Sequence, residues 1–94
     1  TPSEFYVSAN YPNPFNPSTM IDIETIEAGD LMVSVFDAKG RMVNNLVNRY
    51  LEAGRYSAKW NGMDATGRSM PTGVYFIRVQ SGLDMHTQKM ILMK

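Results

Sequence analysis

Residues 11–19 read Tyr-Pro-Asn-Pro-Phe-Asn-Pro-Ser-Thr, and this segment constrains the fold more than any other part of the chain. We call it the proline loop. Each proline fixes its own φ, lacks a backbone N–H and pushes the preceding residue toward extended conformations. The segment is therefore excluded from a helix and from the middle of a sheet. Tyr11 and Phe15 supply apolar rings that can pack against a core, so we expect an ordered structural plug.

The rest of the chain has the pattern of short strands. Turn signals recur about every eight to twelve residues, and no segment shows sustained helical spacing. In residues 20–26, Ile21 and Ile23 are predicted inward, with polar residues between them. Seven strands are predicted, at residues 5–9, 20–26, 31–36, 41–50, 54–60, 73–79 and 85–93. This arrangement favours an all-β, immunoglobulin-like or fibronectin-like Greek-key sandwich of about seven antiparallel strands.

Two of these strands open alike, each with a glycine followed by inward residues at a period of two. The predicted inward residues are Tyr56, Ala58, Trp60, Tyr75, Ile77 and Val79. Tyr75 also stands where a tyrosine corner would bond its hydroxyl to upstream backbone. In the last strand, Ile91 and Met93 are predicted to close the core.

Methionine is frequent, with eight in the chain. Five occupy apolar strand positions, namely Met20, Met32, Met42, Met90 and Met93. Because the methionine side chain is flexible, we expect these five to fill gaps in the core.

Two Asp-x-x-Gly sequences predict turns. Asp37 begins a hairpin in which its side chain bonds backbone two residues on, and Gly40 takes the left-handed position of a type I turn with a G1 bulge. Asp64 fits a second turn of the same kind. A further turn, Ser81-Gly82-Leu83-Asp84, precedes the last strand.

Length and charge limit the possible functions. Ninety-four residues make a single domain, residues 1–94, with one core. Nine basic residues balance nine acidic ones, so no net field favours nucleic acid as a partner. There is no cysteine, no apolar run of the ~20 residues that span a membrane, and no signal-peptide pattern in residues 1–10. If the domain is exported, the signal lies in a larger parent chain of which this is the C-terminal module.

We expect neither a catalytic residue nor a cofactor. His86, the only histidine, lies in a strand, and no glycine-rich nucleophile turn precedes a serine. The loop with Asn61, Asp64 and Thr66 offers oxygen atoms but one carboxylate, fewer than calcium usually takes. A plain turn without metal is favoured there, with calcium left as an open question.

A sugar-binding row of aromatic side chains is the other site to weigh. Its members would be Tyr50, Tyr56, Trp60 and Tyr75. Three of these four share the inward parity of their strands, so core packing is favoured.

Six short motifs follow one another through nearly the whole chain. The series begins with the proline loop and ends at Lys-Met-Ile-Leu-Met-Lys, and between these stand Phe-Asp-Ala-Lys-Gly-Arg, Ala-Gly-Arg-Tyr, Trp-Asn-Gly-Met-Asp and Gly-Val-Tyr-Phe. In these motifs the chain resembles the type A C-terminal sorting domain of type IX secretion cargo. That family overlaps in sequence with the immunoglobulin-like domain of flagellar hook-capping proteins.

The resemblance implies a function in recognition. A sorting domain is read by the outer-membrane secretion machinery, and a sortase-like processing protein then commonly removes it. The upstream cargo domain of the same chain is anchored or released at the surface of a Gram-negative bacterium, after passing through the periplasm. The matching recognition residues are Lys89, Met90, Ile91, Leu92, Met93 and Lys94. The matching structural residues are Tyr11, Pro12, Asn13, Pro14, Phe15, Gly73 and Tyr75.

We expect the last strand to carry recognition, because an end strand can offer unpaired backbone groups or side chains to a receptor. A sorting domain ends its polypeptide, and this sequence ends at the family's terminal lysine. The alternative is an immunoglobulin-like structural or accessory module, a spacer or a carbohydrate-binding unit, in a multidomain extracellular enzyme. A hook-cap-like assembly domain belongs to the same structural class.

Overall fold

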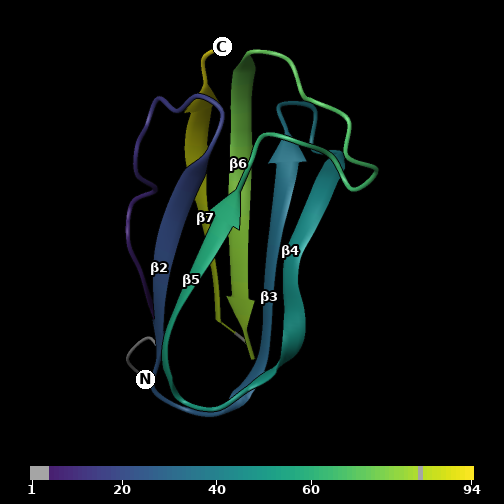
Figure 1. Cartoon of the computed structure of the whole chain (residues 1–94). Coiled ribbons are helices and arrows are strands. Elements are labelled where there is room, and N and C mark those ends of the chain that lie inside the picture. The colour runs from purple at the N-terminus through teal and green to yellow at the C-terminus, as the bar shows by residue number, and fades with distance from the viewer. Residues whose placement is uncertain (1–4, 83) are drawn as a thin grey trace.

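The computed structural model describes residues 5–82 and 84–94, which form two antiparallel sheets facing each other (Figure 1). The strands are β1 (Phe5–Val7), β2 (Thr19–Thr25), β3 (Gly29–Asp37), β4 (Met42–Leu51), β5 (Gly54–Trp60), β6 (Gly73–Ser81) and β7 (Asp84–Leu92). The predicted all-β sandwich of seven strands is confirmed. Within these residues there is no helix long and apolar enough to cross a membrane.

The sheets contain three and four strands. The three-stranded sheet has the order β1-β2-β5, and the four-stranded sheet has the order β4-β3-β6-β7. The chain crosses between them after β2, after β4 and after β5, while β3-β4 and β6-β7 pair as sequential antiparallel neighbours. These crossovers place β2 beside β5 and β3 beside β6, as the predicted Greek-key connections require.

The core lies between the sheets and is built from alternate residues of the strands. Its buried hydrophobic residues are Phe15, Ile21, Ile23, Leu31, Val33, Val35, Val43, Ala58, Trp60, Tyr75, Ile77, Val79, Met90 and Leu92. Every residue predicted inward on β2, β5 and β6 is in this set except Tyr56, which is half-buried. Tyr56 lines an open groove between β5 and the facing edge of β4, where the core is incompletely covered.

Period-two alternation predicted the strands to within one or two residues at most ends. The bounds of β5 agree with the prediction at both ends, whereas β1 ends at Val7, two residues early. The predicted turn at residues 81–84 contains Leu83, which lies outside the described residues. Gly82 in that turn has a φ of +60°, a left-handed conformation that favours glycine.

The expectation that five methionines fill the core is wrong for most of them. Only Met90 is buried; Met20 is half-buried, and Met32, Met42 and Met93 are exposed. Met32 stands between two buried residues of β3, so alternation turns it toward solvent. Met42 precedes the buried Val43 and is turned outward for the same reason.

The inward residues of the last strand also differ from the prediction. Met90 and Leu92 face the core, whereas Ile91 is half-buried and Met93 is exposed. The register with β6 explains the difference, because Met90 pairs with the buried Tyr75 and paired residues face the same side of a sheet. The core parity of β7 is therefore decided by its neighbour.

Replacing Trp60 by alanine should lower the free energy of unfolding by about 3–5 kcal/mol, because the side chain is 1% exposed and its removal leaves a cavity. Chemical denaturation followed by circular dichroism measures the change. The matched control is Tyr50→Ala, which removes an aromatic ring that is 61% exposed and should change stability by about 0.5 kcal/mol or less. Equal losses in the two variants would contradict this account of the core.

Candidate recognition segment

The proline loop leaves the three-stranded sheet and closes the edge of the four-stranded one. At its start, Tyr11 and Met20 exchange backbone hydrogen bonds of 2.9 and 3.0 Å. At its centre, the Phe15 N–H donates to Ile91 O and the Met93 N–H donates to Phe15 O, both at 2.9 Å. Phe15 thus forms a parallel bridge with Leu92 at the end of β7.

Side chains hold the loop in this place. The Asn13 Oδ1 atom accepts a 3.0 Å bond from the Ile91 N–H. Pro12 O accepts a 2.8 Å bond from the Thr19 hydroxyl, which in turn accepts a 3.0 Å bond from the buried Asn10 amide. The bonds of Asn10 and Thr19 could not be predicted from the sequence, because a single polar residue beside a proline-rich segment gives no period-two signal.

Phe15 also begins a column of three aromatic rings. Phe15 and Trp60 meet edge to face at 5.5 Å between ring centroids, and Trp60 and Tyr75 do so at 5.0 Å. The Tyr75 hydroxyl donates a 2.6 Å bond to Pro71 O, four residues upstream, so the predicted tyrosine corner is confirmed. Of the two loop rings expected to pack on the core, Phe15 does so at 2% exposure, while Tyr11 is 48% exposed.

Four of the seven predicted structural residues, Asn13, Phe15, Gly73 and Tyr75, lie around the end of β7, whereas Tyr11 pairs with Met20 on β2. Asn13 and Phe15 bond the β7 backbone, Tyr75 supports the ring column, and Gly73 pairs with Leu92. Pro12 contributes its carbonyl oxygen to the Asn10 and Thr19 network, and Pro14 is exposed between Asn13 and Phe15. The peptide bonds that precede Pro12 and Pro14 are cis.

Residues 89–94, the candidate recognition segment, divide into buried and exposed positions. Met90 and Leu92 belong to the core, and Lys89, Met93 and Lys94 are exposed. The Lys94 N–H donates a 3.1 Å bond to the Thr72 hydroxyl, and its Nζ atom donates to the Ser69 hydroxyl. The last residue is thus tied to the connection between β5 and β6.

Unpaired backbone groups were expected in residues 89–94, but most of those on the outer edge of β7 lie earlier in the strand. Ile91 and Met93 already bond to the proline loop. Since alternate residues of an antiparallel strand point their N–H and C=O groups to one side, Met85, Thr87 and Lys89 face this same edge. Within the described part of the chain, no backbone group pairs with them there. The open edge is therefore residues 85–89, which overlaps the candidate segment only at Lys89.

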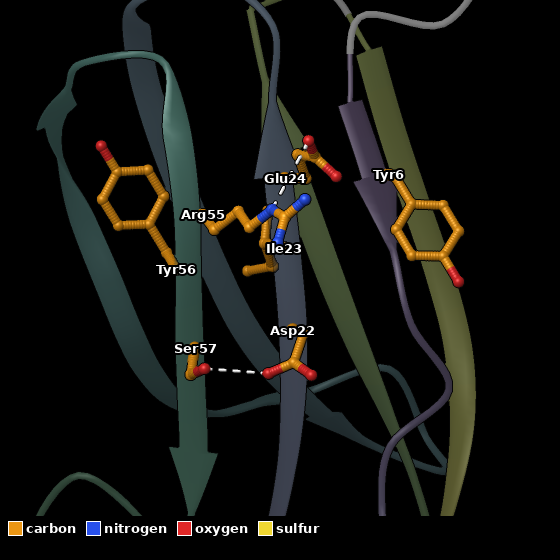
Figure 2. A pocket seen from close by; sticks show the side chains of 7 residues that line it. All are labelled: Tyr6, Asp22, Ile23, Glu24, Arg55, Tyr56 and Ser57. Carbon is orange, nitrogen blue, oxygen red and sulfur yellow. Dashed lines mark hydrogen bonds and ion pairs between the residues drawn. The ribbon is translucent and has the colours of Figure 1, made fainter.

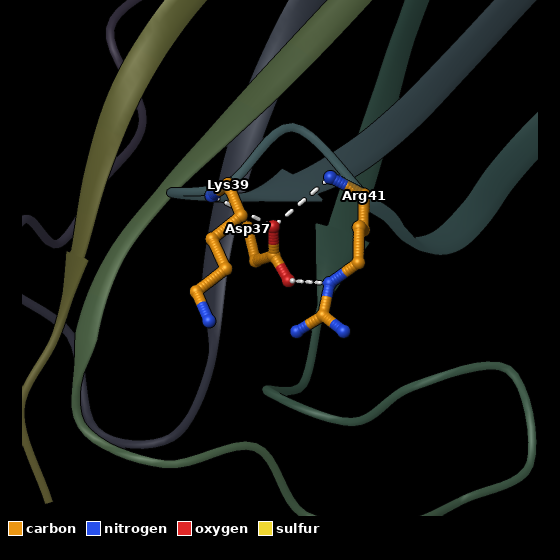
Figure 3. A network of polar contacts seen from close by, with 3 residues as sticks. All are labelled: Asp37, Lys39 and Arg41. Carbon is orange, nitrogen blue, oxygen red and sulfur yellow. Dashed lines mark hydrogen bonds and ion pairs between the residues drawn. The ribbon is translucent and has the colours of Figure 1, made fainter.

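Two turns of the same design, at Asp37 and Asp64, line one open groove. In the first, Asp37 Oδ1 accepts bonds from the N–H groups of Lys39 and Arg41 at 2.9 and 3.0 Å (Figure 3). Gly40 has a φ of +85°, and Asp37 and Arg41 are also bonded through their backbones, as the predicted turn and bulge require. The Arg41 N–H, more than any other group, holds the pKa of Asp37 below its ordinary value.

The second turn repeats this arrangement at Asp64. Its Oδ1 atom accepts bonds from the Thr66 hydroxyl at 2.7 Å and from the N–H groups of Thr66 and Arg68 at 2.9 Å. The Thr66 hydroxyl contributes most to lowering the pKa of Asp64. The Asp64 carboxylate, the one carboxylate of the loop weighed for calcium binding, therefore accepts hydrogen bonds from within the turn. Among the described residues, no three His, Cys, Asp or Glu side chains gather to form a metal site.

The remaining candidates from the sequence are separated by the fold. Trp60 and Tyr75 are buried and Tyr50 is exposed on β4, so the four aromatic residues weighed for sugar binding form no common surface. His86 is exposed on β7, and its Nε2 atom lies 2.9 Å from the Gln88 side-chain oxygen.

Comparison with known proteins assigns the fold to a family. The model of the FlgD Ig-like domain matches residues 13–84, which is more than half of the chain. The chain belongs to the FlgD Ig-like domain family. No curated protein sequence shows a significant match to this Ig-like domain.

Solved structures show the same fold. The Ig-like domain is similar to part of PorZ, described as an essential bacterial surface component of the type-IX secretion system of Porphyromonas gingivalis, at 25% identity and a TM-score of 0.63. It is also similar to Xanthomonas campestris FlgD, described in terms of hook capping essential for flagellar assembly, at 25% identity and a TM-score of 0.64. Dimeric latent PorU from P. gingivalis shares the fold, with a TM-score of 0.70 at 24% identity.

The shares of each chain that align differ widely. The alignments cover 96%, 94% and 96% of this chain for PorZ, FlgD and PorU. The chain spans only 11% of PorZ and 9% of PorU, but 66% of FlgD. The likeness is therefore to one domain of the two larger proteins.

The double variant Asp37→Asn/Asp64→Asn should be less stable than the wild type at pH 7, and the difference should shrink in acid. A carboxylate whose folded pKa is lowered stabilises the fold above its unfolded pKa and loses this effect as pH falls through the folded value. The decline should therefore begin near 3.8, the ordinary aspartate value, and continue below it. Urea unfolding from pH 2 to 7 measures the difference.

The matched variant Asp37→Ala/Asp64→Ala removes the accepting oxygen as well as the charge. It should be less stable than the asparagine variant across this pH range, because asparagine retains an acceptor for the turn. A difference between wild type and asparagine variant that does not change with pH would refute the electrostatic role of the two turns.

Proposed function

We propose that this Ig-like domain is a sorting domain of the type IX secretion system, recognised through its last strand. In this proposal it directs the upstream cargo domain of its parent chain across the outer membrane of a Gram-negative bacterium. The partners are the outer-membrane machinery and a sortase-like processing protein, and the cargo is anchored or released at the cell surface. Because the FlgD Ig-like family is a structural domain family, the domain needs no catalytic residue for this function.

The observation that carries the proposal is the geometry of residues 89–94. They end an edge strand whose buried residues, Met90 and Leu92, fix the backbone, while Lys89, Met93 and Lys94 remain exposed. A rigid strand with alternate exposed side chains suits recognition by a receptor, because little conformational entropy is lost on binding. The likeness to part of PorZ, a component of that secretion system, supports the same assignment.

The two exposed lysines make the proposal testable by export. The whole chain is fused behind a signal peptide and a fluorescent reporter and expressed in a bacterium with type IX secretion. We expect the reporter outside the cell, and we expect the variant Lys89→Glu/Lys94→Glu to accumulate in the periplasm with its stability changed by about 0.5 kcal/mol or less. Cell fractionation and thermal melting measure the two quantities.

The matched control is Arg49→Glu/Lys59→Glu, which makes the same change of charge at exposed positions on β4 and β5. It should be exported like the wild type. Equal export of both variants would show that Lys89 and Lys94 are not read by the secretion machinery. Deleting residues 91–94 is a poorer test, because Leu92 is part of the core.

A structural module is the second candidate, and the FlgD match favours it. The family model and the FlgD alignment cover most of the chain, and FlgD is described by its part in hook capping. In this case the domain braces or spaces its neighbours in a multidomain protein or an assembly. Failure of the intact fusion to leave the periplasm would favour this candidate.

A further inference from the structure

The outer face of the three-stranded sheet carries two exposed tyrosines. Tyr6 on β1 is 64% exposed and Tyr11 in the proline loop is 48% exposed. The other tyrosine with comparable exposure is Tyr50, at 61%, which stands on β4 in the opposite sheet. A pair of exposed aromatic rings on one sheet therefore distinguishes this face.

Cross-strand pairing places both tyrosines on the same side as the polar residues of β2. Tyr6 pairs with Glu24, and Tyr11 pairs with Met20. Paired residues of antiparallel strands project to the same face. Their partners on β2 are four residues apart, or about 13 Å at ~3.3 Å per residue, so the two rings stand toward opposite ends of one surface.

Tyr11 is held down on this face by its hydroxyl group. The hydroxyl donates a 2.9 Å bond to Asp22 Oδ2 and lies 3.8 Å from the sulfur atom of Met20. The ring therefore reaches along β2, from the level of Met20 to that of Asp22, instead of standing away from the sheet. A ring fixed in this way is ready to stack, because binding does not have to immobilise it.

Two pairs of polar side chains bridge β2 and β5 on this face, and Tyr6 lies beyond them on β1 (Figure 2). Asp22 Oδ1 accepts a 2.8 Å bond from the Ser57 hydroxyl, and Glu24 lies 3.7 Å from the Arg55 guanidinium. An open groove of ≈ 360 Å³ runs among these side chains and Tyr6. Beside Tyr11, Met20 of β2 pairs with Lys59 of β5.

The charges on this face cancel. Glu24 on β2 pairs directly with Arg55 on β5. Asp22 pairs with Ser57, and Lys59 lies two residues further along β5 on the same face. A face with equal numbers of acids and bases does not select an anion or a cation. It does offer both hydrogen-bond donors and acceptors, spaced between apolar rings.

We propose that this face binds a neutral oligosaccharide, which stacks on Tyr6 and Tyr11 and bonds through its hydroxyl groups to Asp22, Ser57 and Arg55. Sugar rings present C–H groups on their faces and hydroxyl groups at their edges, which matches tyrosine rings separated by polar side chains. None of these residues belongs to residues 89–94, so the proposal does not rest on the proposed sorting function.

Calorimetric titration of the whole chain with neutral hexasaccharides tests the proposal. The probes are cellohexaose, xylohexaose, mannohexaose, laminarihexaose and chitohexaose. We expect at least one to bind, with affinity reduced about tenfold or more in Tyr6→Ala and in Tyr11→Ala. Tyr11→Phe keeps the ring but loses the bond to Asp22, so its affinity should fall less than that of Tyr11→Ala.

Tyr50→Ala is the matched control, since it removes a ring of similar exposure from the other sheet, and it should leave binding unchanged. Circular dichroism confirms that each variant is folded, and Tyr6→Ala alone decides the matter if Tyr11→Ala disturbs the loop. Absence of binding by all five sugars at millimolar concentration would overturn the proposal. So would a wild-type dimer in sedimentation that Tyr6→Ala dissociates, because the face would then be an interface between two copies.

Discussion

The column of rings formed by Phe15, Trp60 and Tyr75 is the contact on which the rest of the sandwich depends. The three residues come from the proline loop, β5 and β6, so the column joins both sheets to a segment that belongs to neither. Each edge-to-face pair adds about 0.5–1.5 kcal/mol beyond the burial of the rings. The polar ends of the rings add further bonds, from Trp60 Nε1 to Met63 O at 2.8 Å and from the Tyr75 hydroxyl to Pro71 O. The column therefore also anchors the long connection between β5 and β6.

The ring column also fixes the position of the proline loop, because Phe15 packs on Trp60. The backbone of Phe15 then bonds to Ile91 and Met93 and closes this part of the β7 edge. An open strand edge invites pairing with other chains, and prolines are poor partners for extending a sheet. The loop covers Ile91 and Met93 with its own backbone and with the Asn13 side chain. The remainder of the edge, at residues 85–89, stays available for a partner strand. The proline loop therefore protects the edge within residues 89–94, where the sorting proposal relies on exposed side chains.

The sandwich separates two kinds of surface. The four-stranded sheet includes β7, with Lys89 in the strand and Lys94 two residues after its end, and the sorting proposal assigns these two lysines to a protein receptor. The three-stranded sheet presents Tyr6 and Tyr11 around a neutral polar centre, which suits a different ligand. Both surfaces are made of side chains on paired strands or on a bonded loop, so their geometry is set by the sheets that support them. A family of structural domains can acquire such sites without changing its core.

The sequence by itself determined the strands, their turns and most of the core, because these follow from local chemistry. Alternation marked Ile21, Ile23, Trp60 and Tyr75 as inward, and the Asp37 and Asp64 turns follow from one carboxylate and one glycine at a fixed spacing. Met32 and Met42 are exposed although both are apolar, because their position in the alternation of the strand sets the side that each side chain faces.

Tertiary structure alone decided how the distant segments meet. The parity of β7 was set by its register with β6, and the closing of its edge by a bond between Asn13 and Ile91 across 78 positions of sequence. The pairing of Tyr6 and Tyr11 on one face likewise required β1 and the proline loop to lie along β2. A period of two reports which side of its own strand a residue occupies, but it carries no information about which strand or loop lies beside it.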